Sequence, residues 1–235
     1  MATIIIDDEE FTSTFIHDKL IEWAGVGKTS DVHHLLSVPE VNPNVYNEDG
    51  LTPIAHAALC DRGDMIEFLL SDPRVNPNIP NNNGDTPLAL AVQERNLDAL
   101  HALVKNPRVS VNQANEDDTT PLLLCFQNGY SEELVVLMKR DDLQFNTRHK
   151  NGSTPLFHAC LNRHLCVVQH ALACGDRRLD TKQSFQNSSP VEYAGILQNK
   201  EFQELFSSYN TNPEETIMSL RLQLGIPEGN SCVKV

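Results

Sequence analysis

The stretch WAGVGKTS, residues 23–30, contains residue types that could bind a nucleotide. Gly27, Lys28 and Thr29 match the last three positions of a phosphate-binding loop, in which backbone N–H groups and the lysine hold the phosphates. The complete pattern needs a glycine five residues before Gly27, but that position is Glu22, whose carboxylate would sit against the phosphates. Nucleotide binding is therefore not the reading we favour.

A second candidate for chemistry is the segment HACLNRHLCVVQHALAC, residues 158–174. Four Cys or His ligands in a tetrahedron would bind zinc, and several of these residues are four apart in the sequence. The residues of this type are His158, Cys160, His164, Cys166, His170 and Cys174. A metal-linked signalling protein is therefore an alternative function.

The last four residues, CVKV (232–235), have the shape of a prenylation signal. A lysine in the third place is unusual, and no basic stretch precedes it to supply a second membrane signal. The terminal Val-Lys-Val could instead add a strand to a PDZ-type domain. A lipid-anchored protein is thus a further alternative, whereas we expect residues 227–235 to be a disordered tail.

The amino-acid composition of the chain limits the kinds of partner that it can bind. The formal net charge is −14 and the pI is near 4.9, which argues against nucleic acid and favours a basic partner. No apolar run approaches the length of a membrane span, and the start MATIIIDDEE is acidic where a secretory signal is basic. The six cysteines are scattered, as expected for reduced thiols in the cytoplasm or nucleus.

Internal repeats identify the elements that position these residues. A Thr-Pro pair recurs every 34 residues, and Ser189-Pro190 follows after 35. The Thr-Pro pairs begin at Thr52, Thr86, Thr120 and Thr154, and a second marker with the same step comprises Asn44, Asn78, Asn112, Asn146 and Asp180. In each unit the threonine can cap a helix whose first residue is the proline, as Thr86 does for Pro87. A second helix follows, Leu97–Val104 in this unit, after a turn near Arg95-Asn96.

This pattern resembles the ankyrin repeat, whose signature is T-P-L-H-x-A. The matching segments are GLTPIAHAALC (50–60), GDTPLALAVQE (84–94) and GSTPLFHACLN (152–162), with DTTPLLLCFQN (118–128) one glycine short. The resemblance covers roughly residues 15–206 and implies an all-α solenoid of about six repeats plus a C-terminal capping helix. The signature histidine is replaced by Ala55, Ala89, Leu123 and Phe157, so its hydrogen bond should be absent.

The repeat register assigns the candidate residues to structural positions. Gly27-Lys28-Thr29 aligns with the turn between the two helices of a degenerate first repeat. Cys160 aligns with Ala58 and Val92, and Cys125 aligns with Ala57 and Ala91, so both are expected in the core. We therefore expect neither a metal, a cofactor nor an enzyme.

The register also divides the chain. The predicted parts are an acidic leader (1–14), a degenerate capping repeat (15–47), four central repeats (48–183), a degenerate last repeat (184–210), a capping helix (211–226) and the tail (227–235). In the capping helix Asn212 should be the N-cap and Gly225 the end. Ile217, Leu220 and Leu224 should cover the open face of the last repeat.

The resemblance implies a protein partner, bound by the tips of the β-turn fingers and by the first helices. The finger-tip positions are Glu48, Asp49, Asn82, Asn83, Glu116, Asp117, Lys150 and Asn151. The helix positions are Leu59, Cys60, Gln93, Glu94, Gln127, Asn128, Leu161 and Asn162. With Arg148 beside Lys150, this face should grade from acidic to basic.

The predicted protein is thus a monomeric adaptor whose partner has a basic or mixed-charge surface. Bacteria that inject proteins into eukaryotic cells also use such arrays, so an effector in the host cytoplasm is one form of this function. Asn44 and Asn78 each lie eight residues after a leucine, a spacing that resembles the one in ankyrin-repeat asparagines that are hydroxylated.

Overall fold

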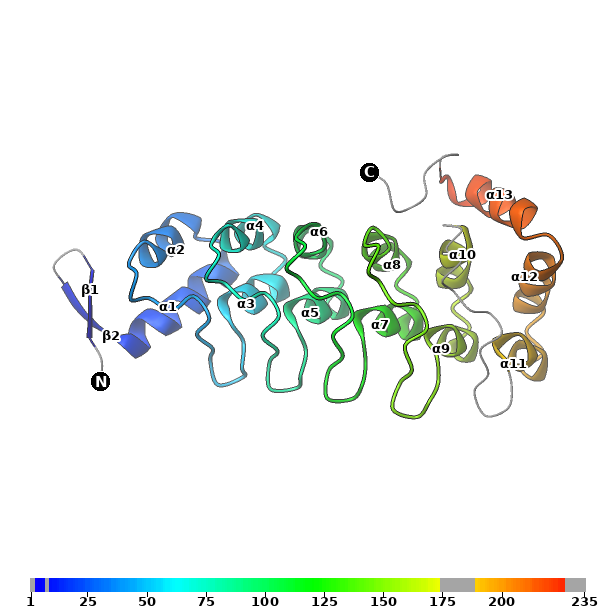
Figure 1. Ribbon diagram of the computed structural model, residues 1–235, viewed down its shortest axis with the longest axis horizontal. Helices are drawn as coiled ribbons and strands as arrows, with labels where there is room; N and C mark the ends of the chain where they lie inside the picture. Colours follow the sequence, from blue (N-terminus) through cyan, green and yellow to red (C-terminus); the bar gives the residue numbers. More distant parts are fainter. Residues whose placement is uncertain (1–2, 7–8, 174–188, 227–235) are drawn as a thin grey trace. The chain divides into compact units, whose positions relative to one another are not determined.

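Figure 1 shows the computed structural model of the chain, which describes residues 3–6, 9–173 and 189–226. The chain divides into two compact units, residues 1–116 and 117–235, and each is described by itself. In both units, short helices form helix–turn–helix pairs that are joined by longer loops. This arrangement confirms the helical repeat fold predicted from the 34-residue period. No helix in the described residues is both long and apolar enough to cross a membrane.

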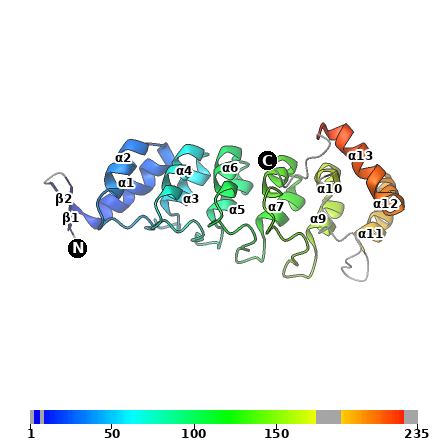
Figure 2. The same cartoon turned by 45° about the horizontal axis from the view of Figure 1, so that its top comes forward.

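Unit 1 contains rows of packed helices. Its elements are β1 (Thr3–Ile6), β2 (Glu9–Thr12), α1 (Ser13–Val26), α2 (Thr29–Leu36), α3 (Pro53–Leu59), α4 (Gly63–Ser71), α5 (Pro87–Gln93) and α6 (Leu97–Lys105). Helix α3 packs between α1 and α5, while α4 packs on α6. Figures 1 and 2 show the same order, with the loops before α3 and α5 extending from one side. Neighbouring pairs therefore bury a continuous core, as stacked repeats require.

The N-terminal hairpin is an element that the sequence pattern does not predict. Strands β1 and β2 pair antiparallel, with Thr3 opposite Thr12 and Ile6 opposite Glu9. The acidic leader expected over 1–14 thus contains ordered backbone in the described residues. The hairpin is hard to predict from the sequence because each strand has only four residues.

The repeated threonines act as predicted. The hydroxyl of Thr86 accepts a hydrogen bond from the N–H of Ala89 at 3.2 Å, and Thr52, Thr120 and Thr154 make the equivalent bond. Ser189 completes a capping box with Glu192, whose carboxylate accepts the N–H of Ser189 at 2.7 Å. Each cap satisfies a backbone donor that the first helical turn leaves unpaired.

The stretch around Lys28 is a turn between two helices. Helix α1 ends at Val26 and α2 begins at Thr29, with Gly27 in the left-handed region at φ 88°. The carbonyl of Trp23 accepts the N–H groups of both Gly27 and Lys28 at 2.9 Å. The segment before the turn is helical, whereas a phosphate-binding loop follows a strand. The prediction that Gly27, Lys28 and Thr29 lie at the turn between the two helices of the first repeat is therefore confirmed.

Unit 2 contains helix pairs of the same kind as unit 1. Its helices are α7 (Pro121–Asn128), α8 (Ser131–Leu137), α9 (Pro155–Asn162), α10 (Leu165–Ala173), α11 (Pro190–Ile196), α12 (Lys200–Thr211) and α13 (Pro213–Leu224). The first helices α7, α9 and α11 form one row, and α8 packs on α10.

Helix α13 begins and ends where the sequence predicts. Asn212 accepts the N–H of Glu215, and Gly225 ends the helix at φ 68°. The helix packs against α10 and α12, burying Leu220 while Ile217 and Leu224 are half-buried. Helix α13 therefore covers part of α12 in the last pair, as expected, but it leaves Ile196 of α11 65% exposed. Residues 227–235, predicted as a disordered tail, lie outside the described residues.

Candidate partner-binding surface

The fingers of unit 1 are hairpin loops shaped by asparagine side chains. In the loop before α3, Asn47 Oδ1 accepts the N–H groups of Asp49 and Leu51 at 3.1 and 2.9 Å. In the loop before α5, Asn81 accepts the N–H groups of Asn83 and Asp85 in the same way. These repeated bonds give both loops the same tight tip.

Successive tips are joined to each other. The backbone N–H of Asn82 donates to the carbonyl of Asp49 at 3.1 Å, and its side-chain amide donates to the carbonyl of Glu48 at 2.7 Å. The N–H of Glu116 donates to the carbonyl of Asn83 at 3.3 Å. The tips of unit 1 therefore form a hydrogen-bonded row. The side-chain amide of Asn82, a predicted partner contact, also holds the neighbouring finger.

The acidic tip residues of unit 1 remain exposed. Glu48, Asp49 and Glu116 are exposed to solvent, and none of them forms a salt bridge with another described residue. On the first helices, Gln93 and Glu94 are also exposed at the C-terminal end of α5. This surface of unit 1 is thus negatively charged, and backbone hydrogen bonds order its tips.

An apolar cluster at the base of these fingers was not predicted as a group. Leu51, Ala55 and Leu90 are buried together, and the half-buried Leu59 packs against them. Of these four residues, only Leu59 is among the positions predicted to bind a partner. Leu51 and Leu90 occupy positions that are polar in other repeats, such as Asp85 and His56, so the period alone does not mark them. Cys60, next to Leu59, is a free thiol of intermediate exposure.

In unit 2 the predicted charges are largely satisfied within the unit. Lys150 forms a salt bridge with Asp117, and this ammonium group lowers the pKa of the Asp117 carboxyl through a hydrogen bond and its charge. Arg148 donates to the carbonyl of Gly152 at 2.7 Å. The cations at the expected basic end of the surface therefore have partners within unit 2. Lys150 neutralises Asp117, and Arg148 binds a backbone carbonyl of its own finger loop.

Several predicted polar residues of unit 2 also hold backbone groups. Asn151 Oδ1 accepts the N–H of Ser153, Asn128 donates to Leu124 and Asn162 donates to the carbonyl of Gln127. Their side chains are consequently oriented by the fold. Leu161, 42% exposed, is an apolar member of the predicted set that faces solvent.

The Cys/His segment is distributed over different environments. Cys160 is buried, Cys166 is exposed, and His164 Nε2 lies 2.9 Å from the carbonyl of Gln127. His158 Nε2 lies 2.6 Å from the Ser153 hydroxyl, and burial lowers the pKa of this imidazole. Among the described residues, no group of three His, Cys, Asp or Glu side chains could hold a metal ion. Cys174 and the CVKV end lie outside the described residues.

The buried and exposed cysteines should differ in their rates of reaction with a thiol reagent. Burial raises the pKa of Cys160 to about 12 and that of Cys125 well above its usual value, where the charge of Glu133 adds to the effect. Since the thiolate is the reactive form, iodoacetamide should label Cys125 and Cys160 of the native protein at least about 100-fold more slowly than Cys166. Peptide mapping by mass spectrometry would measure this. Rapid labelling of native Cys125 would contradict its assignment to the core.

The family comparison agrees with this geometry. A protein-family model described as ankyrin repeats (3 copies) matches residues 20–115, which span most of unit 1. A search among curated proteins finds no match.

Proposed function

We propose that this chain is a non-enzymatic binding module that holds its partner on the finger surface of unit 1. The chain is an ankyrin-repeat protein, and the repeats of this family serve protein–protein interaction. We define the finger surface as the exposed tips Glu48, Asp49, Asn83 and Glu116 with the half-buried Leu59 at their base. The partner presents Lys or Arg side chains to the tips and an apolar group to Leu59.

The observation that carries this proposal is the hydrogen-bonded row of acidic tips. Because Asn82 and Glu116 each bond to the preceding finger, the carboxylates are displayed on an ordered backbone. Preorganised groups lose less conformational entropy on binding than groups on mobile loops. Exposed carboxylates also raise the association rate of a basic partner, an effect that salt screens.

A photo-crosslinker at Asn83 would identify the partner. Asn83 is exposed at the tip, and its side chain makes no hydrogen bond within the described residues. A crosslinking residue at this position should capture the partner, whereas the same residue at Asp98, in the first turn of α6, should not. Equal capture from both positions would contradict the proposed surface.

Charge reversal then tests the mechanism with the identified partner. The triple variant Glu48→Lys, Asp49→Lys, Glu116→Lys should weaken binding at least tenfold, or roughly 1.4 kcal/mol, because it places cations against a basic partner. The matched control reverses three exposed carboxylates in first turns of second helices, Asp64, Asp98 and Glu132. If titration calorimetry shows equal losses for the two triples, overall charge rather than the finger surface determines binding.

A further inference from the structure

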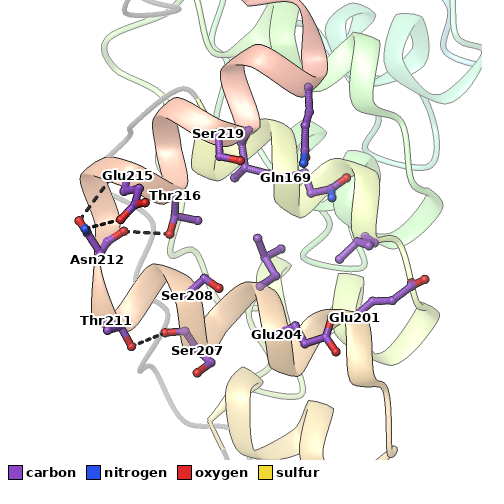
Figure 3. A pocket seen from close by; sticks show the side chains of 14 residues that line it. Gln169, Glu201, Glu204, Ser207, Ser208, Thr211, Asn212, Glu215, Thr216 and Ser219 are labelled. Carbon is purple, nitrogen blue, oxygen red and sulfur yellow. Dashed lines mark hydrogen bonds between the residues drawn. The ribbon is translucent and has the colours of Figure 1, made fainter.

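Unit 2 contains a groove that is separate from the fingers. It encloses about 700 Å³ between helices α10, α12 and α13. Figure 3 shows Glu201 and Glu204 on α12, Ser219 on α13 across the groove, and Gln169 of α10 between them. The two walls converge at Asn212, which joins α12 to α13.

The groove lies beside α12, a second helix that does not pack on the second helix before it. Two pairs of second helices in the preceding repeats pack on one another, α4 on α6 and α8 on α10. Helix α12 instead packs on α11 and α13, while α10 packs on α13, so α10 and α12 are not a packed pair. Only Phe202 and Phe206 of α12 are buried, compared with five residues of the shorter α6. The helix therefore presents a polar face to the groove.

Beside neutral polar side chains, the lining contains three leucines and three carboxylates, of which Glu215 accepts a hydrogen bond from the Asn212 amide. Leu165 and Leu205 are half-buried, and together with the buried Leu220 they supply the apolar surface. Glu201 and Glu204 lie one turn apart on α12, both exposed, and neither forms a salt bridge or hydrogen bond within the described residues. No lysine, arginine or histidine lines the groove.

We propose that this groove binds a short basic and partly apolar segment of a partner protein, in addition to the partner on the fingers. Leucine side chains of the segment would lie against Leu165, Leu205 and Leu220, and its Lys or Arg side chains would pair with Glu201 and Glu204. A helix placed in a groove uses this combination of apolar anchors and flanking charges. Charge complementarity selects such a segment, because an acidic one would be repelled by both carboxylates.

A designed peptide tests the site on the full-length chain. The probe is a fluorescein-labelled amphipathic helix of Lys, Leu and Ala, about 14 residues long, and the comparison probe has Glu in place of every Lys. Fluorescence anisotropy should show saturable binding of the Lys probe alone, weakened by added salt. The absence of saturable binding up to about 100 µM would overturn the proposal.

Matched charge-reversal variants test whether the probe binds in the groove. Glu201→Lys with Glu204→Lys should raise the Kd at least tenfold. The control pair Glu132→Lys with Glu214→Lys changes the net charge equally, at two exposed first-turn carboxylates outside the groove, and should change the Kd less than about threefold.

Leucine-methyl spectra of the unmodified chain provide a readout that does not depend on how the variants fold. The probe should shift the methyl signals of Leu165, Leu205 and Leu220 most. Equal losses in the two variant pairs, or the largest shifts elsewhere, would overturn the groove as the site. Self-association that Glu201→Lys with Glu204→Lys abolishes would identify a second copy as the occupant and would also overturn it.

Discussion

Gly84→Ala is expected to lower the free energy of unfolding by about 3 kcal/mol, because two separate costs arise at this position. Gly84 has φ 81°, a backbone conformation that favours glycine. A Cβ atom there would also lie 2.6 Å from the backbone N of Glu116 in the next finger. Backbone cannot rotate away as a side chain can, so the fingers of unit 1 would have to separate. Urea denaturation followed by circular dichroism would measure the loss.

The matched control for Gly84→Ala lies one repeat further along the sequence. Asp118 occupies the same repeat position and has φ 57°, so a residue with a side chain is held in the left-handed region. Asp118→Gly should therefore stabilise the protein, by about 0.5–1 kcal/mol. If both substitutions shift the urea midpoint in the same direction, the left-handed backbone is not what determines stability here.

The fold was largely predictable because its determinants are local and repeated. Thr86, Pro87 and their equivalents fix helix starts within a few residues, and Asn212 and Gly225 bound α13 in the same way. The hairpin of β1 and β2 occurs once and has no periodic signal. The position of α13 against α10 and α12 depends on how far α12 departs from regular stacking, and no single residue encodes that departure.

The candidate surface was less predictable than the fold. The sequence identifies which residues occupy finger tips, but it does not show which of them are already bonded. Lys150 pairs with Asp117, and the amide of Asn82 binds the carbonyl of Glu48, so both side chains have partners within their own unit. The groove beside α12 has no periodic signal in the sequence, because it lies where α10 and α12 do not pack on each other.

Removal of α13 should destabilise unit 2 by about 3–5 kcal/mol. A chain ending at Thr211 loses the buried Leu220 and the half-buried Ile217 and Leu224. It also loses the hydrogen bond from Arg221 Nε to the carbonyl of Ala173, 2.7 Å long, at the last residue of α10. The apolar surfaces that α10 and α12 turn toward α13 would then be exposed. Size-exclusion chromatography should show aggregation, and hydrogen exchange should show reduced amide protection in α10 and α12.

A chain ending at Ile226 is the control, since it keeps all of α13 and removes only residues 227–235. It should retain the stability and the exchange protection of the full-length protein. Leu220→Ala tests the same packing without shortening the chain and should cost about 2–3 kcal/mol, because Leu220 is the residue of α13 with the least exposed surface. If the two truncated chains behave alike, helix α13 does not hold α10 and α12 together.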